Sequence, residues 1–301
     1  MRWLRSISTP TGRGRALGLG LVSAVVLAGC AASAVLAAPV AAAATPSNYV
    51  CAGGIPIDPQ LIPPGNYGSV TVTGSCYMEG TYTIAHGLTV ASGAELDAAV
   101  FFPAFFNAFV GVPSPYTYGT PCDVFLTVSG GVRVMQGAVL YLGNSAGTMC
   151  QNTSDVVSVQ GGIRAVGAAA VVVHGTTVNG GISVTGGDAG PVPTAATPLG
   201  PYVAVEDSTL NGGATLSGNN ILWLGFSSNT AHGVVTVSNN TVTDPDIDVG
   251  ANTIDGNLVC SGNVSAPGNT PDSPNNVIGP GAGVASPNMV TGMETGQCAG
   301  L

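Results

Sequence analysis

A short alternation of apolar and polar residues, introduced by glycine, recurs along most of the chain. The segment at 130–136, GGVRVMQ, is typical, because two glycines precede Val132, Arg133 and Val134. Alternate residues of a β-strand point to opposite faces, so each segment predicts a short strand with one face buried. Seven segments of this kind begin at Gly87, Gly130, Gly161, Gly180, Gly212, Gly233 and Gly256.

The spacing of these segments predicts a coil with turns of about 20 residues. Their first apolar positions are 44, 31, 19, 32, 20 and 24 residues apart, at Leu88, Val132, Ile163, Ile182, Ala214, Val234 and Leu258. Three of these gaps fit a single turn. The three longer gaps contain loops at 98–121, 143–155 and 188–201. Insertions at the corners of turns leave the stacked strands in register.

A second set of apolar runs lies between the glycine-led strands, at 138–142, 169–173, 202–205 and 221–224. Their continuous apolar character predicts strands that are buried on the inner side of a coil. Asn-Gly, Gly-Asn and Ser-Asn pairs border them and suit corners with positive φ. We therefore predict an all-β fold, a right-handed parallel β-helix with capped ends and loop insertions. The hand follows from the strong bias of crossover connections between parallel strands.

The first 44 residues have the pattern of a signal peptide. Four arginines lie within the first fifteen positions, an apolar stretch follows at 16–38, and Ala42-Ala43-Ala44 supplies small residues for cleavage. We expect export, and hence a secreted or cell-surface protein. The alternative is a lipoprotein anchored through Cys30, because Leu27-Ala28-Gly29-Cys30 has lipobox spacing, although the residues after Cys30 stay apolar.

Residues 45–301 are expected to form one β-helix domain. The ends of a coil need covers, because exposed strand edges pair with other chains. We predict an N-terminal cap at 45–80, a phenylalanine-rich insertion at 98–121 and an irregular C-terminal cap at 264–301. Such caps favour a monomer over a filament.

The cysteines predict disulfides. Of the seven cysteines, Cys30 belongs to the leader, which leaves 7 − 1 = 6 in the folded part. An even number in an exported chain favours disulfide bonds, and six cysteines allow fifteen pairings. Sequential pairing is attractive because each pair flanks one irregular segment: Cys51 with Cys76, Cys122 with Cys150, and Cys260 with Cys298.

The charge distribution narrows the range of partners. The six basic residues are all arginines, and only two of them follow residue 44, whereas all fifteen acids do, giving 2 − 15 = −13. A surface of that sign cannot bind nucleic acid through counterion release. The two arginines, Arg133 and Arg164, occupy equivalent outward positions in their segments and are expected to stack on successive turns. They are candidate ligands for an anionic sugar, and the alternative is a surface pair with acids such as Asp155.

Acidic residues give one candidate metal site. Asp244, Asp246 and Asp248 alternate along one extended segment, so their carboxylates would share a face and repel one another until a cation binds. Calcium is therefore the one cofactor that this pattern suggests. Pro245 argues instead for a bulged loop.

Aromatic residues cluster in the insertion at 98–121, which holds five of the seven phenylalanines: Phe101, Phe102, Phe105, Phe106 and Phe109. One hypothesis is a hydrophobic flap that seals the flank of the coil. The other is an exposed patch that docks on an envelope lipid or partner, because so much aromatic area is rarely left in water.

Three features together resemble a group of exported β-solenoid proteins from high-GC bacteria. They are the repeated GG-I/V-x-V-x-G turns, the opening CAGGIPI at 51–57 with PGNY at 64–67, and the closing Gly-Gln-Cys at 296–298. The similarity covers residues 48–298. It implies the fold and export, and it implies no catalytic residue, because the group has no assigned activity.

Two classes of function follow from these features. The first is a secreted structural or binding module without catalytic activity, whose polar faces contact a carbohydrate or an envelope component. The second is a carbohydrate-active enzyme, either a polysaccharide lyase or a glycoside hydrolase of β-helix type, which uses these aspartates or arginines. A hydrolase would need two carboxylates about 5 to 10 Å apart on a concave face.

Overall fold

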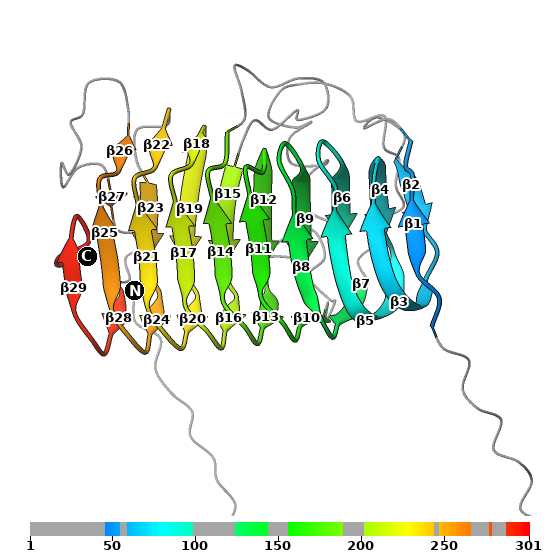
Figure 1. The fold of residues 1–301 in the computed structure, drawn as a ribbon. Coiled ribbons are helices and arrows are strands. Elements are labelled where there is room, and N and C mark those ends of the chain that lie inside the picture. Colours follow the sequence, from blue (N-terminus) through cyan, green and yellow to red (C-terminus); the bar gives the residue numbers. More distant parts are fainter. Residues whose placement is uncertain are drawn as a thin grey trace, which may run out of the picture. The chain divides into compact units, whose positions relative to one another are not determined.

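The computed structural model is a parallel β-helix, in which each turn of short strands stacks on the turn before it (Figure 1). It describes residues 46–54, 59–98, 124–143, 156–188, 202–243, 247–265, 277–278 and 287–301. The predicted all-β coil of parallel strands is confirmed. The described residues form strands and turns with no helix among them, and hence none long and apolar enough to cross a membrane.

The largest sheet contributes two strands to each of the later turns. It begins with three strands, of which the last two are long: β1 (Tyr49–Cys51), β3 (Gly65–Val72) and β5 (Gly80–Val90). The first strands of the later turns are β7 (Val124–Val128), β10 (Val156–Val159), β13 (Thr176–Val178), β16 (Thr209–Leu210), β20 (Thr230–Ala231), β24 (Thr253–Ile254) and β28 (Met289–Val290). The second strands are β8 (Gly131–Val134), β11 (Ile163–Val166), β14 (Ile182–Thr185), β17 (Ala214–Ser217), β21 (Val235–Ser238), β25 (Leu258–Ser261) and β29 (Glu294–Gly296).

Two further sheets complete the turns. The second sheet has nine strands: β2 (Gln60–Ile62), β4 (Ser75–Met78), β6 (Glu95–Ala98), β9 (Val139–Gly143), β12 (Ala170–His174), β15 (Tyr202–Glu206), β19 (Trp223–Ser227), β23 (Ile247–Gly250) and β27 (Val277–Ile278). The third is a short sheet of β18 (Asn220–Ile221), β22 (Thr241–Val242) and β26 (Val264–Ser265).

The strand register follows the predicted repeat with one correction. Leu88 pairs with Val132, and the column continues through Ile163, Ile182 and Ala214. The next partner is Val235, whereas the sequence pattern predicted Val234. Only one glycine begins this turn, so Val234 occupies the place of the second glycine and faces outward. A one-residue offset of this kind reverses which side chains enter the core.

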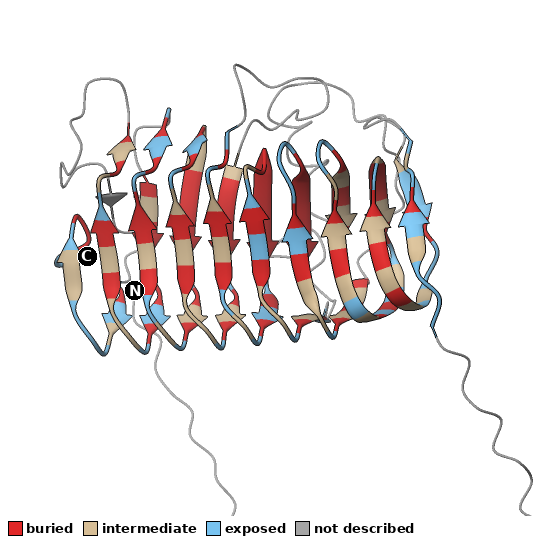
Figure 2. Ribbon diagram, in the orientation of Figure 1, coloured by how far each residue is buried: buried red, intermediate tan, exposed pale blue. Residues whose placement is uncertain are grey.

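The core is a column of aliphatic side chains along the inside of the coil. Inward-facing residues such as Leu88, Val132 and Ile163 are almost completely buried, while their outward neighbours are exposed or half-buried (Figure 2). Burial of this apolar surface is the main favourable contribution to folding. Small aliphatic residues at alternate positions of each strand are therefore enough to form the core.

Buried amides close one set of corners. The side-chain oxygen of Asn240 accepts hydrogen bonds from the backbone and the side-chain amide of Asn219, at 3.1 and 2.8 Å. Its own amide donates to the Leu216 carbonyl and to Asn263. This ladder ends at Gln297 on the last turn. Asn263, which begins a glycosylation-like sequence motif, is therefore wholly buried.

The ends of the coil are more regular than the sequence predicted. Residues 45–80 were expected to form a cap, but β1 to β4 pair as the first turns of the coil itself. The expected C-terminal cap at 264–301 contains the last regular strands, β28 and β29, and residues 297–301 then close the end. Asn288 donates its backbone N–H to the Leu301 carbonyl there.

Two of the three predicted disulfides are present and confirmed. Cys51 bonds to Cys76 and joins the first two turns, and Cys260 bonds to Cys298 and ties the tail to the last turns. The predicted Cys122–Cys150 pair, the predicted signal peptide at 1–44 and the phenylalanines of the insertion lie outside the described residues. Disulfides are compatible with an extracellular location.

Candidate functional site

A column of glycines marks the elbow where the first strand of each turn bends into the second. Its members are Gly87, Gly131, Gly162, Gly181 and Gly213. A Cβ atom on Gly162 would lie 2.7 Å from the backbone oxygen of Gly181, and one on Gly181 would lie 2.9 Å from that of Gly213. Neighbouring turns therefore approach too closely at this elbow for any side chain.

The absence of side chains along this column leaves an open groove of ≈ 840 Å³. Its floor is backbone, and its wall is formed by the outward side chains that follow the glycines: Thr89, Arg133, Arg164, Ser183 and Thr215. Ser69 lies at one end of the column and Val234 at the other. We call this feature the glycine groove. It offers a long polar surface and no enclosed pocket.

Arg133 and Arg164 are direct neighbours within the glycine groove. They are partners in the β8–β11 ladder, which confirms the predicted stacking on successive turns. Both are exposed, and neither lies within 4.0 Å of a carboxylate among the described residues. Asp155, the predicted ion-pair partner, lies outside the described residues.

The arginine pair places two like charges side by side on neighbouring strands. Like charges that lie directly opposite each other on neighbouring strands destabilise a sheet. The same two turns also expose apolar side chains two residues further on, with Met135 46% and Val166 48% accessible. This part of the groove thus combines two cations, which have no carboxylate within 4.0 Å among the described residues, with hydroxyl groups and an apolar strip. Such a surface suits a polar anion that also has carbon surface.

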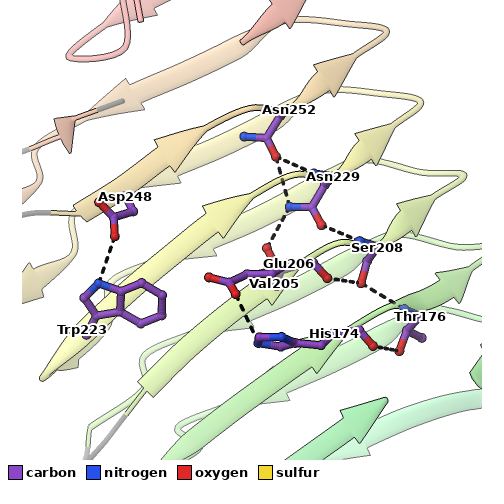
Figure 3. A network of polar contacts seen from close by, with 9 residues as sticks. All are labelled: His174, Thr176, Val205, Glu206, Ser208, Trp223, Asn229, Asp248 and Asn252. Carbon is purple, nitrogen blue, oxygen red and sulfur yellow. Dashed lines mark hydrogen bonds and ion pairs between the residues drawn. The ribbon is translucent and has the colours of Figure 1, made fainter. Parts of the chain in front are cut away.

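A second polar region lies on the outward face of the nine-stranded sheet (Figure 3). His174 Nε2 lies 3.5 Å from Glu206 Oε2. Burial lowers the pKa of His174 to about 4. Burial, with smaller contributions from Asp207 and Asp248, raises the pKa of Glu206 to about 7. Near neutral pH the imidazole is uncharged and the carboxyl partly protonated, so this contact is not an ion pair.

Aromatic rings lie on the same face as Glu206. The indole nitrogen of Trp223 donates a hydrogen bond to Asp248 at 3.3 Å (Figure 3). The Tyr202 ring meets the Trp223 ring edge-on with centroids 6.1 Å apart. A Cβ on Gly225 would lie 2.3 Å from the Trp223 ring, so the indole packs flat against the strand. This arrangement of ring, carboxylate and carboxylic acid resembles the polar and aromatic mixture of sugar-binding surfaces.

The predicted calcium ligands are only partly placed. Asp248 is a half-buried residue of β23 and accepts the Trp223 hydrogen bond, whereas Asp244 and Asp246 lie outside the described residues. Within the described part of the chain, no three His, Cys, Asp or Glu side chains lie together as a metal site would require. Calcium binding at this segment stays a prediction.

Sequence reasoning missed the region around Glu206. Tyr202 and Trp223 belong to the predicted apolar runs at 202–205 and 221–224, and Glu206 follows the first run without being singled out. The available signal was the register, because Tyr202 pairs with Trp223, and Glu206 follows His174 in one column of the sheet.

Comparison of the chain with protein-family models, with curated proteins and with solved structures finds no match. The site geometry therefore carries the functional argument.

Proposed function

We propose that the chain is an exported binding module without catalytic activity that holds an acidic polysaccharide along the glycine groove, at the cell envelope or outside the cell. The observation that carries this proposal is the pair Arg133 and Arg164, two adjacent cations with no carboxylate partner among the described residues. An arginine guanidinium binds a carboxylate through two parallel hydrogen bonds.

The shape of the groove favours a polymer over a small molecule. The groove is open and runs across several turns with the same backbone floor, so it presents one chemistry repeatedly along its length. Small ligands are usually held in concave sites that bury most of their surface. Hydroxyl groups of Ser183 and Thr215 supply partners for sugar hydroxyls beyond the arginines.

The charge of the chain favours a uronate over a nucleic acid. Arg133 and Arg164 are the only lysine or arginine residues after residue 44, against 15 acids, so a densely phosphorylated polymer would be repelled by the rest of the surface. In an acidic polysaccharide, hydroxyl groups separate the carboxylates, so the density of negative charge is lower. Such a polymer can bind the arginines without strong repulsion from the rest of the surface.

The test is calorimetric titration with polygalacturonate, alongside an uncharged glucan. The wild-type chain is expected to bind the acidic polymer and not the glucan, and Arg133→Gln/Arg164→Gln should weaken binding at least tenfold, since each lost charged contact is worth about 1.5 to 3 kcal/mol. Thr236→Gln is the matched control, because Thr236 follows the same column one turn beyond Thr215 and does not line the groove. Equal binding by the double variant would refute the proposal.

A second candidate function, a glycoside hydrolase, is favoured by one observation at Glu206. A carboxyl group with a pKa of about 7 is partly protonated at neutral pH, which suits a general acid. Asp248 would be the second carboxylate and Trp223 the sugar platform. If this candidate holds, the chain releases reducing ends from a glycan, and Glu206→Gln lowers that rate at least a hundredfold while Arg133→Gln/Arg164→Gln does not. A wild-type chain that binds without cleaving any polymer on a glycan panel would eliminate it.

A further inference from the structure

In the direction of the C-terminus, the glycine column of the groove ends at a residue that has a side chain. Following the second glycine position from turn to turn gives Ser69, the five glycines, and then Val234, Asn257 and Met293. The five glycines span four turns of the coil, or roughly 19 Å at about 4.8 Å per turn. Beyond them every position carries a full side chain.

Val234 stands directly at this boundary. Its side chain is 50% exposed and lines the groove, and its backbone oxygen lies against Gly213, the last glycine of the column. A β-branched side chain has restricted rotamers, so Val234 cannot swing aside as a long flexible residue would. The next position is also filled, because Asn257 accepts a hydrogen bond from the Met293 backbone N–H at 2.9 Å.

The two ends of the groove differ in chemistry as well as in shape. Arg133 and Arg164 lie on the second and third of its five glycine turns, and the uncharged Ser183 and Thr215 lie between the arginines and Val234. A bound polymer would therefore have its charges fixed at the arginines and its extension limited in one direction by Val234.

We infer that Val234 is a specificity-determining stop, which sets the length of acidic polysaccharide that the groove accommodates. This inference rests on the proposed function. Removing the side chain restores the glycine found at the same position of the preceding five turns, and it lengthens the backbone floor by one turn. One turn adds about 4.8 Å, which is about the length of one sugar unit.

The experiment measures the affinity of the wild-type chain for oligogalacturonides of increasing length. Affinity should rise with length and then reach a plateau when the groove is filled. In Val234→Gly the plateau should move to oligomers longer by about one unit, with affinity for the longest ones raised roughly two- to fivefold. Val234→Ala serves as a second variant, with an intermediate shift, in case the glycine weakens the fold. Circular dichroism melting checks that each variant is folded.

Met293→Gly is the matched control, because Met293 is exposed in the same column but lies two turns beyond Val234. Its plateau should stay at the wild-type length. A plateau that does not move in Val234→Gly or Val234→Ala, with binding still lost in Arg133→Gln/Arg164→Gln, overturns the stop and leaves the proposed function standing. A wild-type chain that binds no oligogalacturonide overturns both.

Discussion

At the scale of single residues, buried polar side chains hold the turns in place, and the pattern of hydrophobic residues does not reveal them. Asn240 is fully buried, and its side chain takes part in four hydrogen bonds to neighbouring turns, two through the amide oxygen and two through the amide nitrogen. A buried polar group that loses its partner costs far more than the bond itself contributes. The ladder therefore fixes the stacking register and makes each member sensitive to replacement.

Replacing Asn240 with alanine is expected to lower the free energy of unfolding by about 2 to 4 kcal/mol, because it leaves the buried backbone N–H of Asn219 without its acceptor and removes the other hydrogen bonds of the Asn240 side chain. Urea denaturation followed by circular dichroism measures this change. Asn220→Ala, at an exposed position of the adjacent strand, is the matched control and should change stability by less than about 0.5 kcal/mol. Similar losses in both variants would speak against the ladder.

At the scale of strands, the outward face of the nine-stranded sheet introduces a pH dependence. Burial raises the pKa of Glu206 to about 7, above its ordinary value of 4.5. A carboxyl whose pKa is higher in the folded state favours folding when protonated, so its contribution is complete below pH 4.5 and is lost as the pH rises to 7. Burial lowers the pKa of His174 to about 4, which has the opposite effect, a contribution lost as the pH falls from 6.5 to 4.

Glu206→Gln should remove the pH dependence of stability that comes from the carboxyl group and leave the part that comes from His174. The free energy of unfolding of this variant, relative to wild type, is expected to rise between pH 4.5 and pH 8 by up to about 3 kcal/mol. Urea denaturation at the two pH values, with wild type at each, measures the difference. A constant difference between variant and wild type across this range would contradict the raised pKa of Glu206.

Strand positions could be predicted from the sequence because they depend on a period of two and on paired glycines. Arg133 and Arg164 were correctly placed as neighbours for that reason. The prediction that Val234 is the first core residue of its turn is wrong because this turn begins with one glycine instead of two. Val234 therefore faces outward, and the core begins one residue later. The pair of His174 and Glu206 was missed because it requires the second set of strands to be aligned across the insertion at 188–201, which breaks the spacing of about 20 residues per turn.

At the scale of the whole coil, the binding proposal and the enzyme proposal use opposite regions of the turn. The glycine groove lies at the elbow of the large sheet, whereas Glu206 and Trp223 lie on the nine-stranded sheet. The location of a bound oligosaccharide thus decides between the two functions.

The most direct measurement is a crystal structure of the chain with a bound oligogalacturonide. We expect a uronate carboxylate within hydrogen-bonding distance of the Arg133 and Arg164 guanidinium groups, with the sugar chain following the glycine column toward Val234. An oligosaccharide bound against Trp223 and Glu206, with the arginines uncontacted, would contradict it.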